Sequence, residues 1–155
     1  MPNKPEFLII HHTGGTAANP LADTSHHTLE MVDAYHKSLG WEMIGYHFFI
    51  EKDGTPRKGR EENYHGAHTK GMNERSLGIC LAGNFDLTLP TQAQTDALSG
   101  LLGQLQAKYG IPLEKIVPHR KFANKTCYGK NLADDWAQKL PSKAPLKLIL
   151  LDMLE

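Results

Sequence analysis

Short apolar segments, separated by amphipathic and polar stretches, constrain the fold of this chain most strongly. They are rich in branched and aromatic side chains and stop after a few residues, which favours buried strands over helices. Four such segments are predicted as strands, at residues 7–10, 44–51, 76–83 and 116–117. The third is expected at the centre of the sheet. A further strand at 56–60 is expected at an edge, because Pro56 cannot donate a ladder hydrogen bond.

The stretches between these strands predict helices. Thr91 and Gln94 have the spacing of a capping box, and a leucine face follows it until Gly110, so a helix is predicted there. A first helix is expected between Thr28 and Gly40, and a last one around residues 131–140. Because strands alternate with helices, the predicted fold class is α/β, a single domain with a central mixed β-sheet flanked by helices.

The first helix and the long segment after the edge strand complete the local predictions. Tyr35 and Leu39 are expected on the apolar face of the first helix. The segment 61–75 is polar and has no helical period, so it is predicted to be a long functional loop. The histidines in or near the first helix are expected at the protein surface: His26, His27 and His36.

The length of 155 residues suits one domain. We expect residues 1–140 to form it. The tail, 141–155, carries several leucines together with an isoleucine and a methionine, so we expect it to dock on the body of the domain or on a partner chain.

Charge and hydropathy exclude several classes of partner. The chain has 17 basic and 17 acidic side chains, so no net charge attracts it to nucleic acid or to an anionic membrane. No apolar run approaches the roughly 18 residues of a membrane span. The first six residues lack the apolar core of a signal peptide, so synthesis in the cytoplasm is expected.

A histidine and a cysteine lie close together after the last predicted strand. Cys127 follows His119 by eight positions, and Lys125 precedes the cysteine by two. Imidazole and thiolate are ligands that zinc prefers, and a catalytic zinc site has three protein ligands with a fourth position open. The segment therefore suggests a zinc site whose third ligand comes from elsewhere, and nine histidines in the chain favour a metal. The alternative is a surface loop with an unrelated histidine and a buried cysteine.

Four features, taken in order, resemble those of a known family. They are His11 at a strand end, residues 45–48 before an Asp-Gly turn, residues 66–73, and the segment from His119 to Cys127. In order and spacing the chain is similar to the zinc-dependent N-acetylmuramoyl-L-alanine amidases, the family of phage lysozyme-amidases and peptidoglycan recognition proteins. The resemblance covers roughly residues 7–140 and implies the amidase fold.

The resemblance implies the roles of five residues. His11, His119 and Cys127 match the ligands of a single Zn²⁺ per chain, with His12 facing away. Tyr46 and Lys125 match catalytic positions, and the lysine is typical of the phage branch. The implied reaction is hydrolysis of the amide between N-acetylmuramic acid and L-alanine in bacterial peptidoglycan, by an endolysin that reaches the cell wall after release or export.

The loop 65–73 resembles the segment that borders the substrate groove in this family. The resemblance therefore makes His68, Lys70 and Asn73 candidates for contacts to the stem peptide or glycan. His47 is expected to face away from Tyr46, because neighbouring side chains in a strand alternate.

Other interpretations remain open. They are a peptidoglycan-binding module without catalysis, a structural zinc domain with four protein ligands, and a cytoplasmic muropeptide-recycling amidase. Non-catalytic relatives lack the cysteine ligand, and recycling relatives carry aspartate at the position of Cys127. The RNA polymerase binding of one phage relative is not carried over, because only about six residues precede the first predicted strand.

Overall fold

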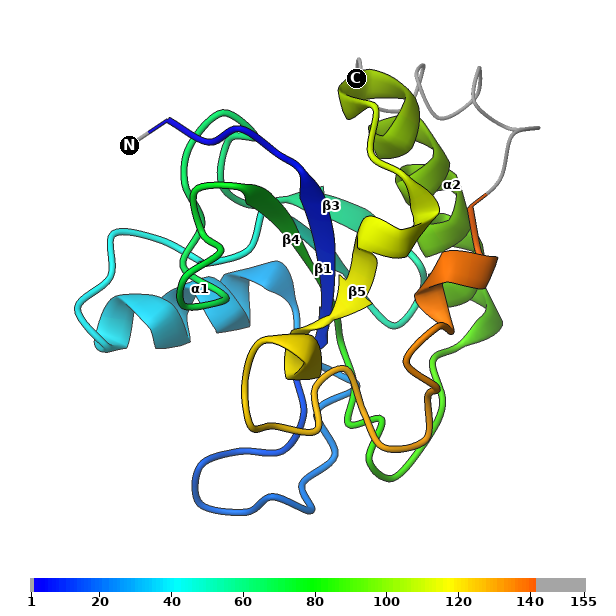
Figure 1. Cartoon of the computed structure of the whole chain (residues 1–155). Coiled ribbons are helices and arrows are strands. Elements are labelled where there is room, and N and C mark those ends of the chain that lie inside the picture. The colour runs from blue at the N-terminus through cyan, green and yellow to red at the C-terminus, as the bar shows by residue number, and fades with distance from the viewer. Residues whose placement is uncertain (1, 142–155) are drawn as a thin grey trace.

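The computed structural model describes residues 2–141. A five-stranded sheet forms its centre, in the order β3-β2-β4-β1-β5 (Figure 1). The strands are β1 (Phe7–His12), β2 (Phe48–Ile50), β3 (Pro56–Lys58), β4 (Ser76–Leu81) and β5 (Ile116–Pro118). All neighbours pair in parallel except β2 and β3, which form an antiparallel hairpin. The predicted mixed sheet, with β4 central and β3 at an edge, is confirmed.

The two helices cover opposite faces of this sheet (Figure 1). Helix α2 (Gln92–Tyr109) packs on the face formed by Leu8 and Ile10 of β1, and helix α1 (Leu29–Ser38) packs on the face of Phe49 and Cys80. Every residue of β4 is buried, as expected for a strand covered on both sides. Alternation along β1 therefore sends His11 to the α1 face and His12 to the α2 face.

Helix α2 forms as predicted. The Thr91 side chain accepts a hydrogen bond from the Gln94 backbone, and the Gln94 side chain accepts one from the backbone N–H of Thr91. These bonds satisfy N–H groups that have no partner within the helix. Gly110 ends the helix with φ 66°, a left-handed conformation that glycine adopts without strain.

Helix α1 also forms, with Thr28 as its N-cap, but its buried face differs from the prediction. Val32 and His36 are buried, whereas Tyr35 and Leu39 remain 55% and 51% exposed. The prediction that His36 lies at the surface is wrong. Its Nδ1 accepts a hydrogen bond from the backbone N–H of Gly45 at 2.9 Å, which ties the helix to the segment before β2.

The helix predicted at 131–140 is absent; a single 3-10 turn, η3 (Ala137–Lys139), occurs there instead. Side chains from elsewhere donate hydrogen bonds to backbone carbonyl groups of this segment. Arg120 donates to the carbonyl of Leu132, and the Tyr128 hydroxyl donates to the carbonyl of Ala133. Tertiary contacts thus override the local pattern.

Two further 3-10 turns flank β5: η1 (Leu113–Lys115) and η2 (His119–Lys121). Within residues 2–141, none of the helices has the length and hydropathy needed to cross a bilayer. Residues 142–155, which hold nearly all of the predicted apolar tail, lie outside the part of the chain that the structure describes.

Candidate metal centre and its cavity

Three buried side chains converge beyond the end of the sheet. One donor atom from each of His11, His119 and Cys127 lies within 4.8 Å of the others. His11 lies on β1, and His119 opens η2 directly after β5. Since β1 and β5 are parallel neighbours, their carboxyl ends lie at the same edge, where open α/β sheets bind ligands. The turn of η2 lies at this end of β1 in Figure 1.

The two adjacent histidines of β1 have different environments. The rings of His11 and His119 lie 4.6 Å apart between centroids, whereas His12 packs beside Phe85 and its Nδ1 accepts the Phe85 backbone N–H at 3.0 Å. His12 also lines the cavity that holds the cluster, so the expectation that it faces away from the metal stays a prediction.

The cluster histidines are neutral at physiological pH. Burial, followed by the positive charge that His68 would carry, lowers the pKa of His11 well below 6.5. Burial, followed by the charge of Lys125, lowers the pKa of His119 to about 4. Both imidazoles therefore keep a lone pair for a metal ion.

Cys127 completes a donor set suited to zinc. Burial raises the pKa of its thiol to about 12, although the backbone N–H of His12 and the charge of Lys125 act in the opposite direction. The His12 N–H donates to Sγ at 3.4 Å, an arrangement that stabilises a thiolate. Two imidazoles and one sulfur fit a zinc site with an open fourth position, and a metal ion would displace the thiol proton on binding.

A cavity of about 440 Å³ opens over the cluster. The three candidate ligands line it together with Tyr46 and Lys125. The tyrosine ring lies 5.0 Å from the His11 ring. Burial, followed by the negative charges that Cys80 and Cys127 would carry, raises the Tyr46 pKa well above 10. The hydroxyl therefore remains a hydrogen-bond donor at neutral pH.

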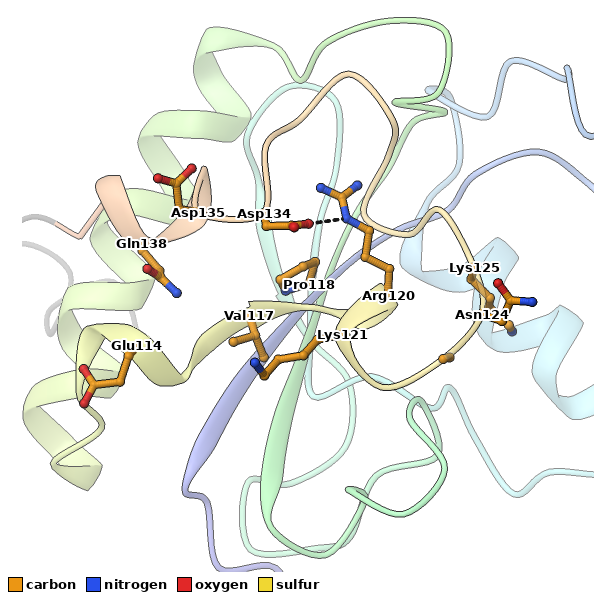
Figure 2. A pocket seen from close by; sticks show the side chains of 11 residues that line it. Glu114, Val117, Pro118, Arg120, Lys121, Asn124, Lys125, Asp134, Asp135 and Gln138 are labelled. Carbon is orange, nitrogen blue, oxygen red and sulfur yellow. Dashed lines mark hydrogen bonds and ion pairs between the residues drawn. The ribbon is translucent and has the colours of Figure 1, made fainter.

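Lys125 lies between this cavity and a second one of about 510 Å³. Figure 2 shows the second cavity, with Lys125 on the side away from Asp135 and Gln138. Two of the residues that line it, Arg120 and Asp134, form an ion pair of 2.6 Å, drawn as a dashed line in Figure 2. Lys125 is also exposed to solvent.

The loop 61–75 contains no helix or strand, and its three candidate residues differ in position. His68 lines the metal cavity, whereas Lys70 and Asn73 are not among the described residues that line it. Lys70 is exposed. The Asn73 Oδ1 accepts the backbone N–H groups of His68 and Thr69, at 2.9 and 3.0 Å. Asn73 therefore shapes the loop, and contact of these three residues with substrate stays a prediction.

One wall of the cavity is not indicated by the sequence. Tyr35, Leu39 and Trp41 line it and are 55%, 51% and 37% exposed. Their spacing alone predicts Tyr35 and Leu39 on the core-facing side of α1. In the structure Val32 and His36 are the buried residues of α1. The aromatic residues at the end of the helix indicate a cavity wall only once this buried face is known.

The rings of His47 and Tyr46 both lie beside His68, with centroids 5.9 and 6.3 Å from it, so these contacts do not show the expected alternation between the two residues. The His47 ring is fully buried; Nδ1 accepts the Gly78 N–H at 3.1 Å, and Nε2 donates to the Tyr64 carbonyl at 2.8 Å. His47 thus joins the loop to the sheet.

Comparisons with known proteins agree with this architecture. A family model described as N-acetylmuramoyl-L-alanine amidase matches residues 1–130. The chain is 40% identical to an endolysin of Enterobacteria phage K11 over 98 residues, which cover 60% of this chain and 64% of the phage protein. The matched region thus spans slightly less than two thirds of that relative.

Two further relatives extend the match. Peptidoglycan-recognition protein SC2 of Drosophila melanogaster is 37% identical over 128 residues, covering 81% of this chain and 69% of that protein. The solved structure of N-acetylmuramoyl-L-alanine amidase LysC from Clostridium intestinale URNW superposes with a TM-score of 0.73 at 36% identity, covering 83% and 79% of the two chains. The predicted fold and family are confirmed: the chain belongs to the N-acetylmuramoyl-L-alanine amidase family.

Proposed function

We propose that the protein is a zinc-dependent N-acetylmuramoyl-L-alanine amidase that degrades bacterial peptidoglycan as an endolysin. The observation that carries this proposal is the convergence of His11, His119 and Cys127 in the lining of one cavity. Membership of the amidase family and the phage endolysin among the relatives support it.

The cavity supplies the groups that amide hydrolysis requires. A bound zinc ion supplies a Lewis acid that polarises the amide carbonyl and acidifies a water molecule. Attack on the carbonyl carbon creates an oxyanion, which Tyr46 stabilises by donating a hydrogen bond and Lys125 stabilises by its positive charge. Both residues line the cavity together with the three candidate ligands.

The apolar wall of the cavity suits the substrate. Tyr35 and Trp41 present aromatic side chains beside the cluster, and such rings pack well against the apolar faces of sugar rings and methyl groups. We assign this wall to contacts with the lactyl, L-alanine or sugar part of the substrate. Tyr35→Ala should raise KM for wall fragments more than it lowers kcat.

The site favours this function over its two family alternatives. A binding module without catalysis has no need for a cysteine ligand, yet Cys127 lies within the cluster. The recycling amidases that resemble this family carry aspartate at that position. Within residues 2–141 the cluster offers three donor residues, whereas a structural zinc site would use four protein ligands.

The test is hydrolysis of insoluble peptidoglycan by the purified protein, with released fragments assayed for new L-alanine amino termini. Zinc content is measured on the same samples. We expect new termini with the parent protein and none after chelation or with Cys127→Ala. Wall binding without new termini would contradict the amidase proposal, and termini that persist in a zinc-free sample would contradict the role of the metal.

A further inference from the structure

A second histidine contacts the candidate ligand His11. The Nε2 of His11 lies 2.9 Å from the Nδ1 of His68, and the two rings meet at 90° with centroids 4.9 Å apart. This contact occupies one ring nitrogen of His11. The other nitrogen, Nδ1, is therefore the one left to face a metal ion, which requires it to be unprotonated and places the proton on Nε2.

The other hydrogen-bond contacts of His68 are compatible with a proton on Nε2 of His11. If His11 Nε2 donates to His68 Nδ1, the proton of His68 must lie on its own Nε2. That nitrogen lies 3.4 Å from the hydroxyl of Ser76, and the hydroxyl donates in turn to the carbonyl of Met72 at 2.7 Å. The chain of donors thus runs in one direction and ends on a backbone carbonyl, which can only accept.

The protein backbone is shaped to hold the His68 ring in this place. A Cβ atom at Gly66 or at Gly78 would lie only 2.5 Å from His68 Cδ2, so any larger residue at either position would collide with the ring. The Asn73 side chain also fixes the backbone N–H of His68. The ring is therefore held against the sheet and directed at His11.

We propose that His68 is a positioning residue: it holds the His11 imidazole in the tautomer and orientation that bind the metal, and so strengthens zinc binding. This inference rests on the zinc-dependent function proposed above and adds a residue that acts through a ligand. Partners of metal-binding histidines commonly contribute about 10- to 100-fold in metal affinity.

Thr69 offers a competing account of the same contact. Its hydroxyl lies 2.9 Å from His68 Nδ1 and 3.4 Å from His11 Nε2. A hydroxyl can accept the His11 proton as well, but the His68 nitrogen lies nearer. A variant that removes only the Thr69 hydroxyl therefore separates the two accounts.

The experiment measures the zinc dissociation constant of each apoprotein by competition with a chromophoric chelator. His68→Phe keeps a ring and removes the acceptor, whereas His68→Asn places Oδ1 near the position of Nδ1. We expect zinc affinity to fall about 10- to 100-fold in His68→Phe, and to stay within about threefold of the parent in His68→Asn and in Thr69→Val. Substitution with Co²⁺ should shift the visible absorption bands in His68→Phe and leave them unchanged in His68→Asn.

Three results would overturn the inference: parent affinity in His68→Phe, equal losses in His68→Phe and His68→Asn, or a tenfold loss in Thr69→Val. Circular dichroism and thermal unfolding of the apoproteins check folding. If His68→Phe does not fold, His68→Gln replaces it, because glutamine matches the position of Nε2 and leaves that of Nδ1 empty. A parent protein that binds zinc without cleaving peptidoglycan would refute the amidase proposal and leave this inference standing.

Discussion

Removal of the Tyr46 hydroxyl tests the catalytic half of the site separately from its metal half. In Tyr46→Phe the ring remains to pack against His11, from which it lies 5.0 Å between centroids. Tyr46 is not part of the donor cluster, so zinc affinity should remain within about twofold of the parent. The neighbouring Cys80 thiol is placed to donate to the Leu81 carbonyl and keeps that partner in the variant, so the change should cost little stability.

The expected loss of rate follows from the protonation of that hydroxyl. Its raised pKa keeps it a donor throughout the neutral range. Removing one donor to a developing oxyanion costs about 100- to 1,000-fold in kcat, or about 2.7–4 kcal/mol of transition-state stabilisation. The assay is release of L-alanine amino termini from peptidoglycan at saturating zinc, with KM and kcat determined separately on soluble fragments.

Tyr109→Phe is the matched control, because it removes a hydroxyl that donates to Glu62, at a site away from the metal cavity. It should lower thermal stability and leave kcat at the parent value. A Tyr46→Phe protein that is folded, binds zinc and hydrolyses wall at the parent rate would refute the assignment of Tyr46.

Three further predictions concern charge, pH and packing. Lys125→Ala should lower kcat by about 100-fold or more while zinc stays bound, and Lys125→Arg should recover part of that rate. Both variants are assayed for wall hydrolysis and for zinc content. An unchanged rate in Lys125→Ala would remove this residue from the mechanism. Burial alone would raise the pKa of Glu62, but hydrogen bonds from Tyr109 and Lys108 outweigh it and lower the pKa below 4.5. The stability that this carboxylate contributes is therefore present above about pH 4.5 and is lost as the pH falls through the lowered value. Denaturant unfolding from pH 6 to 3 should be less pH-dependent in Glu62→Gln, and identical slopes would contradict the assignment. Leu98→Ala, in the fully buried core under α2, should cost about 2–5 kcal/mol of unfolding free energy, whereas a cost below 1 kcal/mol would mean that this core is loosely packed.

Local chemistry made much of the fold predictable. The capping box at Thr91 and the glycine at position 110 define α2 through hydrogen bonds within the segment itself. The buried strands are largely apolar along their length because the sheet is covered on both faces, and this pattern predicts buried strands. The segment 131–140 was not predictable in this way. Its backbone carbonyls bond to Arg120 and Tyr128, two side chains whose positions depend on the folded sheet.

The sequence by itself determined which side chains were available for chemistry. The order of His11, Tyr46, His119 and Cys127 along the chain was enough to indicate the family and the candidate ligands. Alternation along β1 also required that adjacent histidines face opposite sides of the sheet.

Tertiary structure alone decided how those groups are held. The parallel pairing of β1 with β5 brings residues 11 and 119 together across more than a hundred positions, and the return of the loop 61–75 over the sheet directs His68 at His11. The packing of α1 also leaves Tyr35 and Leu39 exposed, because His36 takes the buried position in that helix. Spacing specifies which residues share a face of a helix or strand, but only the packed sheet specifies which face is buried and which partner from a distant segment meets it.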